Sequence, residues 1–254
     1  MEYPLSRSVV PELRLLAASP STNSELLALA ADPAVPSFTA VLTLDQTAGR
    51  GRLDRTWVAP AGTALALSVL VRGALAHPLA SWLPLLAGLT LAEALDEVAP
   101  GRVQVKWPND LLLDDRKVCG ILIEVAPSSG DAVVGSGLNL AQTVEQLPVA
   151  TATSLALAGV PLTPEQLDTV VASYLRRLRG EIETPGPVSR LRERVVARCA
   201  TIGRSVSVLL ADGTTLDGTA TGLDAAGRLE VASATGETVT VAVGDVTHAR
   251  ITAG

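Results

Sequence analysis

The sequence predicts an α/β protein in which a mixed central sheet is flanked by helices and followed by a small C-terminal β-barrel. Up to residue 200, short apolar runs of strand length alternate with helical segments. From residue 203 onward, short alternating strands are separated by Asp-Gly, Ala-Gly and Thr-Gly turns, which is typical of a small all-β domain. We therefore divide the 254 residues into units 1–202 and 203–254.

The elements of the first unit follow from local signals. Thr22 and Glu25 have capping-box spacing, which predicts a helix over 22–31. The long apolar segment 81–98 predicts a core helix, in which Pro84 is tolerated because it falls in the first turn. Apolar and β-branched runs predict strands at 38–44, 63–71, 103–107, 111–113, 117–125 and 132–140. Further helices are expected at 164–178 and 188–200.

The composition excludes several classes of protein. A net charge of −6 argues against a nonspecific nucleic-acid coat, which needs a basic surface. Charges and prolines interrupt the apolar stretches, so no membrane span is expected, and the first residues lack the features of a signal peptide. The two cysteines are far apart and form no CxxC motif, which fits a reduced, cytoplasmic protein without a zinc site.

The basic residues are unevenly divided between arginine and lysine. Arginine supplies 18 of the 20, and the two lysines, Lys106 and Lys117, lie close together in the sequence. A GC-rich genome explains why lysine is scarce, but not where these two lie. Lys117 opens the apolar strand 117–125, where it either directs a cation at a phosphate or carboxylate or extends to solvent as a surface lysine.

The segment from Gly49 to Arg55 has two glycines and three arginines in seven residues. Glycine lets the backbone approach a ligand, and arginine binds phosphate or carboxylate with two parallel hydrogen bonds. The segment therefore predicts binding of a phosphorylated small molecule, although it is neither a Walker A loop nor a GxGxxG motif. The alternative interpretation is a solvated turn with surface arginines.

Three further clusters place polar residues next to predicted strands. Lys106-Trp107-Pro108-Asn109-Asp110 lies between two strands, where its polar groups need partners. Gly135-Ser136-Gly137-Leu138-Asn139 indicates close backbone approach and an amide suited to a purine edge, or else a bulge and a turn asparagine. Ser21-Thr22-Asn23 precedes the first helix, where ordinary N-cap residues are the simpler explanation.

Taken in order, these clusters, together with Gln46 and Asp115-Arg116-Lys117, resemble the biotin protein ligases. The resemblance spans about residues 15–145, and the combination of GRGR and KWPND in one chain is highly specific. It implies a catalytic domain of the class II synthetase type and a C-terminal SH3-like domain. It also implies that biotin is activated with ATP and Mg²⁺ to biotinyl-5′-AMP. The biotinyl group is then passed to a lysine of a biotin carboxyl carrier domain.

The resemblance also implies roles for individual residues. Biotin would be held by Ser21, Thr22, Asn23, Gln46, Arg50, Gly51, Arg52, Lys117, Gly120, Ile121 and Gly137. The nucleotide would be contacted by Arg50, Arg52, Trp57, Lys117 and Asn139. Lys117, Arg52 and Asp110 would be catalytic: Lys117 at the reacting carboxylate, Arg52 in a closing loop, and Asp110 at the acceptor lysine or a magnesium ion. The metal ligands are not assigned.

Such chemistry depends on positioning and charge stabilisation more than on an enzyme nucleophile, and the sequence offers no Ser-His-Asp or Cys-His set. Only 20 residues precede Ser21, too few for the winged-helix domain of relatives that double as repressors, so we expect no DNA binding. Two alternatives stay open: a lipoate–protein ligase, and a non-catalytic sensor of biotinyl-AMP. Cys119 is expected to be buried and inert.

Overall fold

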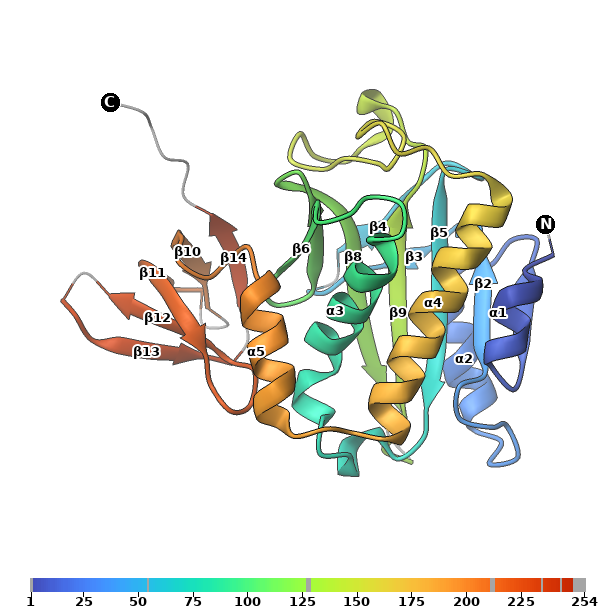
Figure 1. Ribbon diagram of the computed structural model, residues 1–254, viewed down its shortest axis with the longest axis horizontal. Coiled ribbons are helices and arrows are strands. Elements are labelled where there is room, and N and C mark those ends of the chain that lie inside the picture. The colour runs from blue at the N-terminus through green and yellow to red at the C-terminus, as the bar shows by residue number, and fades with distance from the viewer. Residues whose placement is uncertain are drawn as a thin grey trace.

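Seven strands form a mixed central sheet in the order β1-β2-β5-β9-β8-β7-β6 (Figure 1). The computed structural model describes residues 2–53, 55–126, 129–210, 213–233, 235–242 and 244–248. β1 pairs with β2 in parallel, and the remaining neighbours pair antiparallel. The strands are β1 Leu13–Leu16, β2 Ala40–Thr43, β5 Ala64–Val71, β6 Val103–Lys106, β7 Asp110–Leu113, β8 Arg116–Val125 and β9 Ala132–Asn139.

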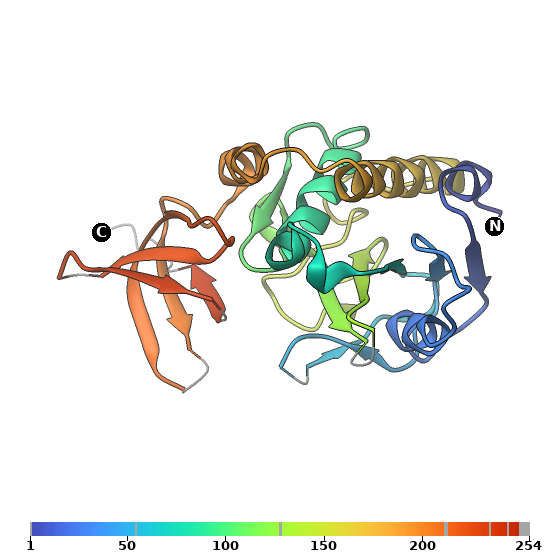
Figure 2. The ribbon, with the colours of Figure 1, turned by 90° about the horizontal axis from the view of Figure 1, so that it is seen from below.

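Helices cover both faces of this sheet unequally (Figure 2). One face carries α1 (Pro4–Val9), α3 (Leu83–Leu95) and α4 (Pro164–Glu183), and most of the buried apolar side chains lie on this side. The other face carries α2 (Thr22–Ala30) over a small core formed by Leu26, Ala30, Val41, Leu70 and Val133. Because this second core is small, much of the sheet on the α2 side is left for polar residues and glycines.

A second, antiparallel sheet follows, in the order β13-β12-β11-β10-β14. Its strands are β10 Ser205–Leu209, β11 Thr215–Leu223, β12 Leu229–Ser233, β13 Thr238–Val241 and β14 Asp245–His248. This arrangement matches the expected small SH3-like domain. The predicted boundary after residue 202 falls between α5 (Val188–Arg198) and β10, and residues 249–254 of the second predicted unit lie outside the described residues.

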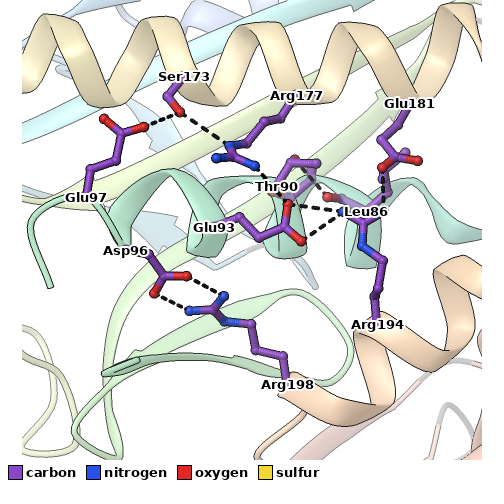
Figure 3. A network of polar contacts seen from close by, with 11 residues as sticks. Leu86, Thr90, Glu93, Asp96, Glu97, Ser173, Arg177, Glu181, Arg194 and Arg198 are labelled. Atoms are coloured by element: carbon purple, nitrogen blue, oxygen red, sulfur yellow. Dashed lines mark hydrogen bonds and ion pairs between the residues drawn. The ribbon is translucent and has the colours of Figure 1, made fainter. Parts of the chain in front are cut away.

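Ion pairs fasten α5 to the two helices beside it (Figure 3). Arg194 of α5 donates to Glu93 of α3 at 2.8 Å and also pairs with Glu181 of α4. Arg198 donates to both carboxylate oxygens of Asp96, at 2.7 and 2.5 Å. The hydrogen bond from Arg198 is the largest of the effects that lower the pKa of Asp96. α5 is thus anchored just before the chain enters the second sheet.

Two tryptophans join the second sheet to the first unit. Trp82 Nε1 donates to Ala225 O and Trp107 Nε1 donates to Gly227 O, each at 3.0 Å. Both indoles are almost completely buried, and both carbonyls belong to the turn between β11 and β12. Gly227 has a φ of +78°, and a Cβ there would lie 3.2 Å from the Trp82 ring. Trp107 is the second residue of the KWPND motif, so this motif takes part in the joint between the two sheets.

The predicted helices and strands of the first unit are confirmed, with ends shifted by a few residues. α1, β1 and the short hairpin of β3 (Gly49–Arg50) and β4 (Thr56–Trp57) were not predicted. α1 is held by a residue far away in the sequence, because Asp168 of α4 accepts hydrogen bonds from the backbone N–H groups of Leu5 and Ser6 at 2.8 and 2.9 Å.

Among the described residues, none of the helices has the length and apolar character needed to span a bilayer.

Candidate functional site

A cleft of about 1180 Å³ opens on the α2 side of the central sheet. Its walls come from the N-terminus of α2, the β3–β4 hairpin, strands β7 to β9 and the near edge of the second sheet. The residues singled out by the resemblance all line it: Ser21, Thr22, Asn23, Gln46, Arg50, Gly51, Arg52, Trp57, Asp110, Lys117, Gly120, Ile121, Gly137 and Asn139. Segments that are far apart in the sequence therefore meet in one place.

The floor of the cleft is made of glycines on neighbouring strands. Gly120 of β8 is paired with Gly137 of β9, and the Trp57 indole packs over both. A Cβ at Gly137 would lie 2.7 Å from Trp57 Cε2, and one at Gly120 would lie 3.4 Å from Trp57 Cζ3. At Gly135 a Cβ would lie 2.3 Å from Asn23 Oδ1. The glycines are therefore required for Trp57 and Asn23 to approach the sheet this closely.

One end of the cleft is a neutral polar site at the start of α2. Ser21 is the N-cap residue, and its Oγ accepts from Ser24 N at 3.4 Å. Gln46 Oε1 accepts from Thr22 N at 3.0 Å and lies 3.2 Å from Thr22 Oγ1. The N-cap explanation for Ser21 is thus correct, and it is compatible with a place in the cleft, because a hydroxyl that accepts a backbone hydrogen bond can still donate its own proton.

Two residues that the sequence interpretation missed lie behind this polar end and bind its side chains. Ser68 of β5 lies 2.6 Å from Asn23 Oδ1 and 2.7 Å from Thr22 Oγ1. Glu124 of β8 accepts from Asn23 Nδ2 at 2.8 Å. Ser68 is the single polar residue in an otherwise apolar strand, Ala64–Val71, and a buried hydroxyl in such a run needs a partner. That isolated polar residue was the available sequence signal.

The other end of the cleft is cationic. Lys117 Nζ lies 2.6 Å from Asp110 Oδ1, so the expected catalytic lysine and aspartate form an ion pair. The Lys117 side chain is 33% exposed, which leaves its ammonium group accessible to a ligand. Lys106 also lines the cleft, so both lysines of the chain belong to the same site.

Asn109 of the KWPND motif connects three parts of the site. Its Oδ1 accepts from Arg52 Nη1 at 3.0 Å, and its Nδ2 donates to Ile121 O at 2.6 Å. Arg52 also donates through Nη2 to Gly244 O, at 3.4 Å, in the second sheet. The arginine-rich loop is therefore held against both the KWPND motif and the C-terminal domain.

The second sheet contributes a charged residue of its own. Arg204 Nη2 donates to Asp115 Oδ1 at 2.6 Å, and both side chains line the cleft close to Lys117. The sequence interpretation did not anticipate Arg204, because the residue precedes the first strand of the second sheet and only the folded chain brings it to Asp115.

The charge of the cleft is opposite to that of the chain as a whole. Among the residues that the structure describes, six cationic side chains and two carboxylates line it, whereas the chain carries a net charge of −6. The cationic residues are Arg50, Arg52, Arg55, Lys106, Lys117 and Arg204, and the carboxylates belong to Asp110 and Asp115. A cleft lined mainly by one sign of charge concentrates and steers ligands of the opposite sign.

Three predicted details need a closer description. Ile121 was expected to give the cleft an apolar wall, but its side chain lies in the main core and only 2% of its surface is exposed. The Asn139 amide is engaged within the protein, with Nδ2 donating to Thr153 O at 2.8 Å and Oδ1 accepting from Gln142 Nε2 at 2.9 Å. Cys119 is completely buried, and this burial raises the pKa of its thiol, as expected for an inert cysteine.

Comparison with known proteins also indicates a biotin protein ligase. The model of the biotin/lipoate A/B protein ligase family matches residues 17–139, and that of the biotin protein ligase C terminal domain matches residues 201–248. A biotin–[acetyl-CoA-carboxylase] ligase from Mycobacterium tuberculosis is 38% identical over 94% of this chain and 90% of its own length. The bifunctional ligase/repressor BirA of Escherichia coli is 39% identical over 64% of this chain and 51% of its own length.

A solved structure agrees with this relationship. The biotin protein ligase from Aquifex aeolicus in complex with biotin and ATP is 25% identical, with a TM-score of 0.77, and the match covers 94% of this chain and all of that one. The family matches thus span both the central sheet and the second sheet, and the M. tuberculosis relative aligns over nearly its whole length. This chain belongs to the biotin/lipoate A/B protein ligase family, on the biotin protein ligase side.

Proposed function

We propose that this protein activates biotin with ATP to biotinyl-5′-AMP and transfers the biotinyl group to a lysine of a biotin carboxyl carrier domain. The observation that carries this proposal is the division of one cleft into two chemically different ends. A neutral hydrogen-bonding end lies at Ser21 to Asn23, and a cationic end lies at Lys117. Trp57 packs on the glycine floor that connects them.

The polar end suits a cyclic urea. Thr22 Oγ1 and Gln46 Oε1 can accept the two ureido N–H groups, while Ser21 Oγ and Gln46 Nε2 can donate to the ureido oxygen. A dithiolane ring has none of these groups, so lipoate would leave this buried polar site without partners. The site therefore favours biotin over the lipoate alternative.

The cationic end suits the first reaction. The biotin carboxylate attacks the α-phosphorus of ATP, a P–O bond forms, and the bond to pyrophosphate breaks. Negative charge on the phosphate oxygens increases in the transition state, and a positioned ammonium group such as that of Lys117 would stabilise it. Arg50 and Arg52 of the arginine-rich loop, the segment from Gly49 to Arg55, would add charge and cover the product, as the resemblance implies.

The acidic residues present fit a magnesium ion that arrives with the triphosphate. Mg²⁺ is commonly bound by substrate phosphates, water and one or two carboxylates. Within the described part of the chain there is no group of three or more His, Cys, Asp or Glu side chains, so a dedicated metal cage is not formed there. Asp110, which pairs with Lys117 at the reacting end, could add an oxygen ligand. A bound ion would offset phosphate charge.

In the second reaction the acceptor amine attacks the carbonyl of biotinyl-5′-AMP, an amide bond forms and AMP leaves. Asp110 already binds one ammonium group, that of Lys117, so its carboxylate is suited to orient a second amine entering the cleft.

Because the reaction consumes ATP and both cysteines are unpaired, buried thiols, we also propose a cytoplasmic location.

The test is incubation of the protein with biotin, Mg-ATP and a carrier domain, followed by intact-mass measurement of the carrier. We expect addition of one biotinyl group, dependent on ATP and abolished when the acceptor lysine of the carrier is replaced by arginine. Lipoic acid is the matched control substrate. Modification by lipoate in preference to biotin would contradict the proposal. Formation of biotinyl-AMP without any transfer would support the sensor alternative instead.

A further inference from the structure

Glu124 joins two segments of the site through a single oxygen atom. Its Oε2 accepts from Asn23 Nδ2 at 2.8 Å and from Arg50 Nη2 at 2.9 Å. Asn23 belongs to the α2 side of the site, whereas Arg50 belongs to the arginine-rich loop. The Glu124 side chain is 25% exposed, compared with 46% for Arg50, so the carboxylate is the more sheltered member of the ion pair.

The carboxylate, together with the carbonyl of Leu122, which accepts from Asn23 Nδ2 at 3.3 Å, determines how the protons are ordered in the polar site. A carboxylate only accepts hydrogen bonds, so Asn23 must present its NH₂ group to Glu124 and its Oδ1 to Ser68. Asn23 Oδ1 has no proton to donate. Ser68 Oγ therefore donates its single proton to Asn23 Oδ1, at a distance of 2.6 Å.

The same reasoning extends to Thr22. The oxygens of Ser68 and Thr22 lie 2.7 Å apart, a contact that needs a proton between them. Since the proton of Ser68 is already used, Thr22 donates to Ser68 rather than to Gln46 Oε1 at the longer distance of 3.2 Å. Thr22 Oγ1 therefore presents its lone pairs to a ligand and acts as a hydrogen-bond acceptor.

We infer that Glu124 is a positioning residue with two tasks: it orders the chain Glu124–Asn23–Ser68–Thr22 so that Thr22 offers an acceptor to a ureido N–H, and it holds Arg50 of β3 at the edge of the site. This inference rests on the proposed function, because it takes the ligand to be a cyclic urea. Glu124 does not itself line the cleft within the described residues, so it acts through Asn23 and Arg50.

Three variants separate the two tasks. Ser68→Ala breaks the proton-ordering chain and leaves the Glu124–Arg50 pair in place. Glu124→Gln keeps an oxygen that can accept from Asn23 but removes the charge that attracts Arg50. Glu124→Leu removes both. The side chain of Ser68 is small, and Gln matches Glu in size. Ser68→Ala and Glu124→Gln are therefore expected to fold even if Glu124→Leu does not.

The first task, the ordering of the protons, is tested by measuring the binding of biotin alone with isothermal titration calorimetry. We expect Ser68→Ala and Glu124→Leu to bind biotin about tenfold more weakly, the value of one lost hydrogen bond of this kind. N-methylated biotin serves as the second probe, because it lacks one ureido donor. The preference for biotin over this analogue should fall in both variants, whereas a purely structural defect would weaken both ligands equally.

The second task, the contact with Arg50, is tested by measuring the release of biotinyl-AMP. The labelling of albumin monitors this release. We expect release to rise about threefold to fivefold in Glu124→Gln, a size typical of one partly exposed ion pair, although this variant keeps the biotin affinity of the parent protein. In Ser68→Ala release should rise only as much as its loss of biotin affinity accounts for, because biotinyl-AMP keeps the ureido ring, and in Glu124→Leu the two effects should combine. If the parent protein binds biotin but the Glu124 variants keep its affinity, its preference over the analogue and its release rate, the inference is overturned. If the parent protein does not bind biotin, the proposed function fails as well.

Discussion

Lys117 and Gly120 face the same side of the sheet although they lie three positions apart in strand β8. A Cβ at Gly120 would lie only 3.4 Å from Lys117 Nζ. In a regular strand, residues three apart point to opposite faces. The pairing of β7 with β8 explains the exception: Leu112 is opposite Lys117 and Leu111 is opposite Cys119, so Val118 is an extra residue that forms a bulge. Val118 and Cys119 both enter the core, and Lys117 is turned into the cleft.

Replacing Lys117 tests whether this turned side chain carries the first reaction. We expect Lys117→Ala to slow pyrophosphate release about 100-fold to 1000-fold, because one preorganised charge contact is worth about 3–4 kcal/mol in a transition state. Lys117→Arg should rescue little, since a planar guanidinium does not replace a compact ammonium group. Biotin binding by calorimetry should change much less than turnover. Near-normal turnover of Lys117→Ala would remove the lysine from the mechanism.

The glycine floor gives a matched pair of substitutions. We expect Gly137→Ala to displace Trp57, because the added Cβ would lie 2.7 Å from the indole, and to raise the KM for biotin and ATP at least tenfold. Gly120→Ala, at 3.4 Å, should have a much smaller effect. Steady-state kinetics and tryptophan fluorescence measure both. Equal effects of the two substitutions would show that the Trp57 contact is not what the floor provides.

Arg52 holds the arginine-rich loop against Asn109 and against Gly244 of the second sheet. We expect Arg52→Gly to let biotinyl-AMP escape before transfer, so that labelling of a noncognate protein such as albumin rises several-fold relative to labelling of the carrier. The loop should also become more sensitive to protease in the presence of biotin and ATP. Unchanged albumin labelling would argue that the loop is held by other contacts.

The tryptophan joint predicts that the two sheets are stabilised together. Trp107→Phe removes the N–H that reaches Gly227 O and should destabilise the protein by about 1–3 kcal/mol, the cost of a buried carbonyl left without a donor. Trp82→Phe removes the corresponding bond to Ala225 O and is the matched control for the same turn. Both are measured by urea denaturation. If only Trp107→Phe also raises the KM for ATP, the KWPND motif transmits the position of the second sheet to the cleft.

The Asp96–Arg198 pair predicts a pH-dependent contribution to stability. The pKa of Asp96 is lowered from its ordinary value of 3.8, chiefly by the hydrogen bond from Arg198. A lowered carboxyl pKa stabilises the fold above the unfolded-state pKa, and the contribution is lost as the pH falls through the folded-state value. Asp96→Asn should therefore cost less than about 1 kcal/mol at pH 7, since solvent screens the pair, and the difference should shrink as the pH falls through the lowered pKa of Asp96. Thermal denaturation at several pH values measures this; a constant difference would contradict it.

The sequence predicted well those parts of the fold that local patterns determine. The strand 64–71 is apolar along its length and is completely buried, and the α2 helix begins at the cap that its sequence indicates. The residues that the resemblance assigns to the site all line one cleft, and they could be named together because the GRGR and KWPND motifs are specific to one family.

What the sequence did not reveal depends on partners far along the chain. α1 is capped by Asp168 of α4, and β3 and β4 are too short to show any periodicity. The bulge at Val118 cannot be recognised from an apolar run, because both core-facing residues beside it are simply apolar. Arg204 reaches the cleft, and Gly244 reaches Arg52, only because the second sheet packs beside it. The assigned roles of the individual site residues remain predictions.

The placement of Lys106 and Lys117 in the cleft has a chemical consequence for the rest of the molecule. These are the only two lysines in the sequence, so the side chains outside the cleft present no primary amine. A mixed anhydride of biotin and AMP acylates primary amines. A molecule of this intermediate that escaped would therefore find, on the enzyme that made it, no lysine target beyond the site it had just left. The arginine-rich exterior would thus limit acylation of the catalyst by its own product.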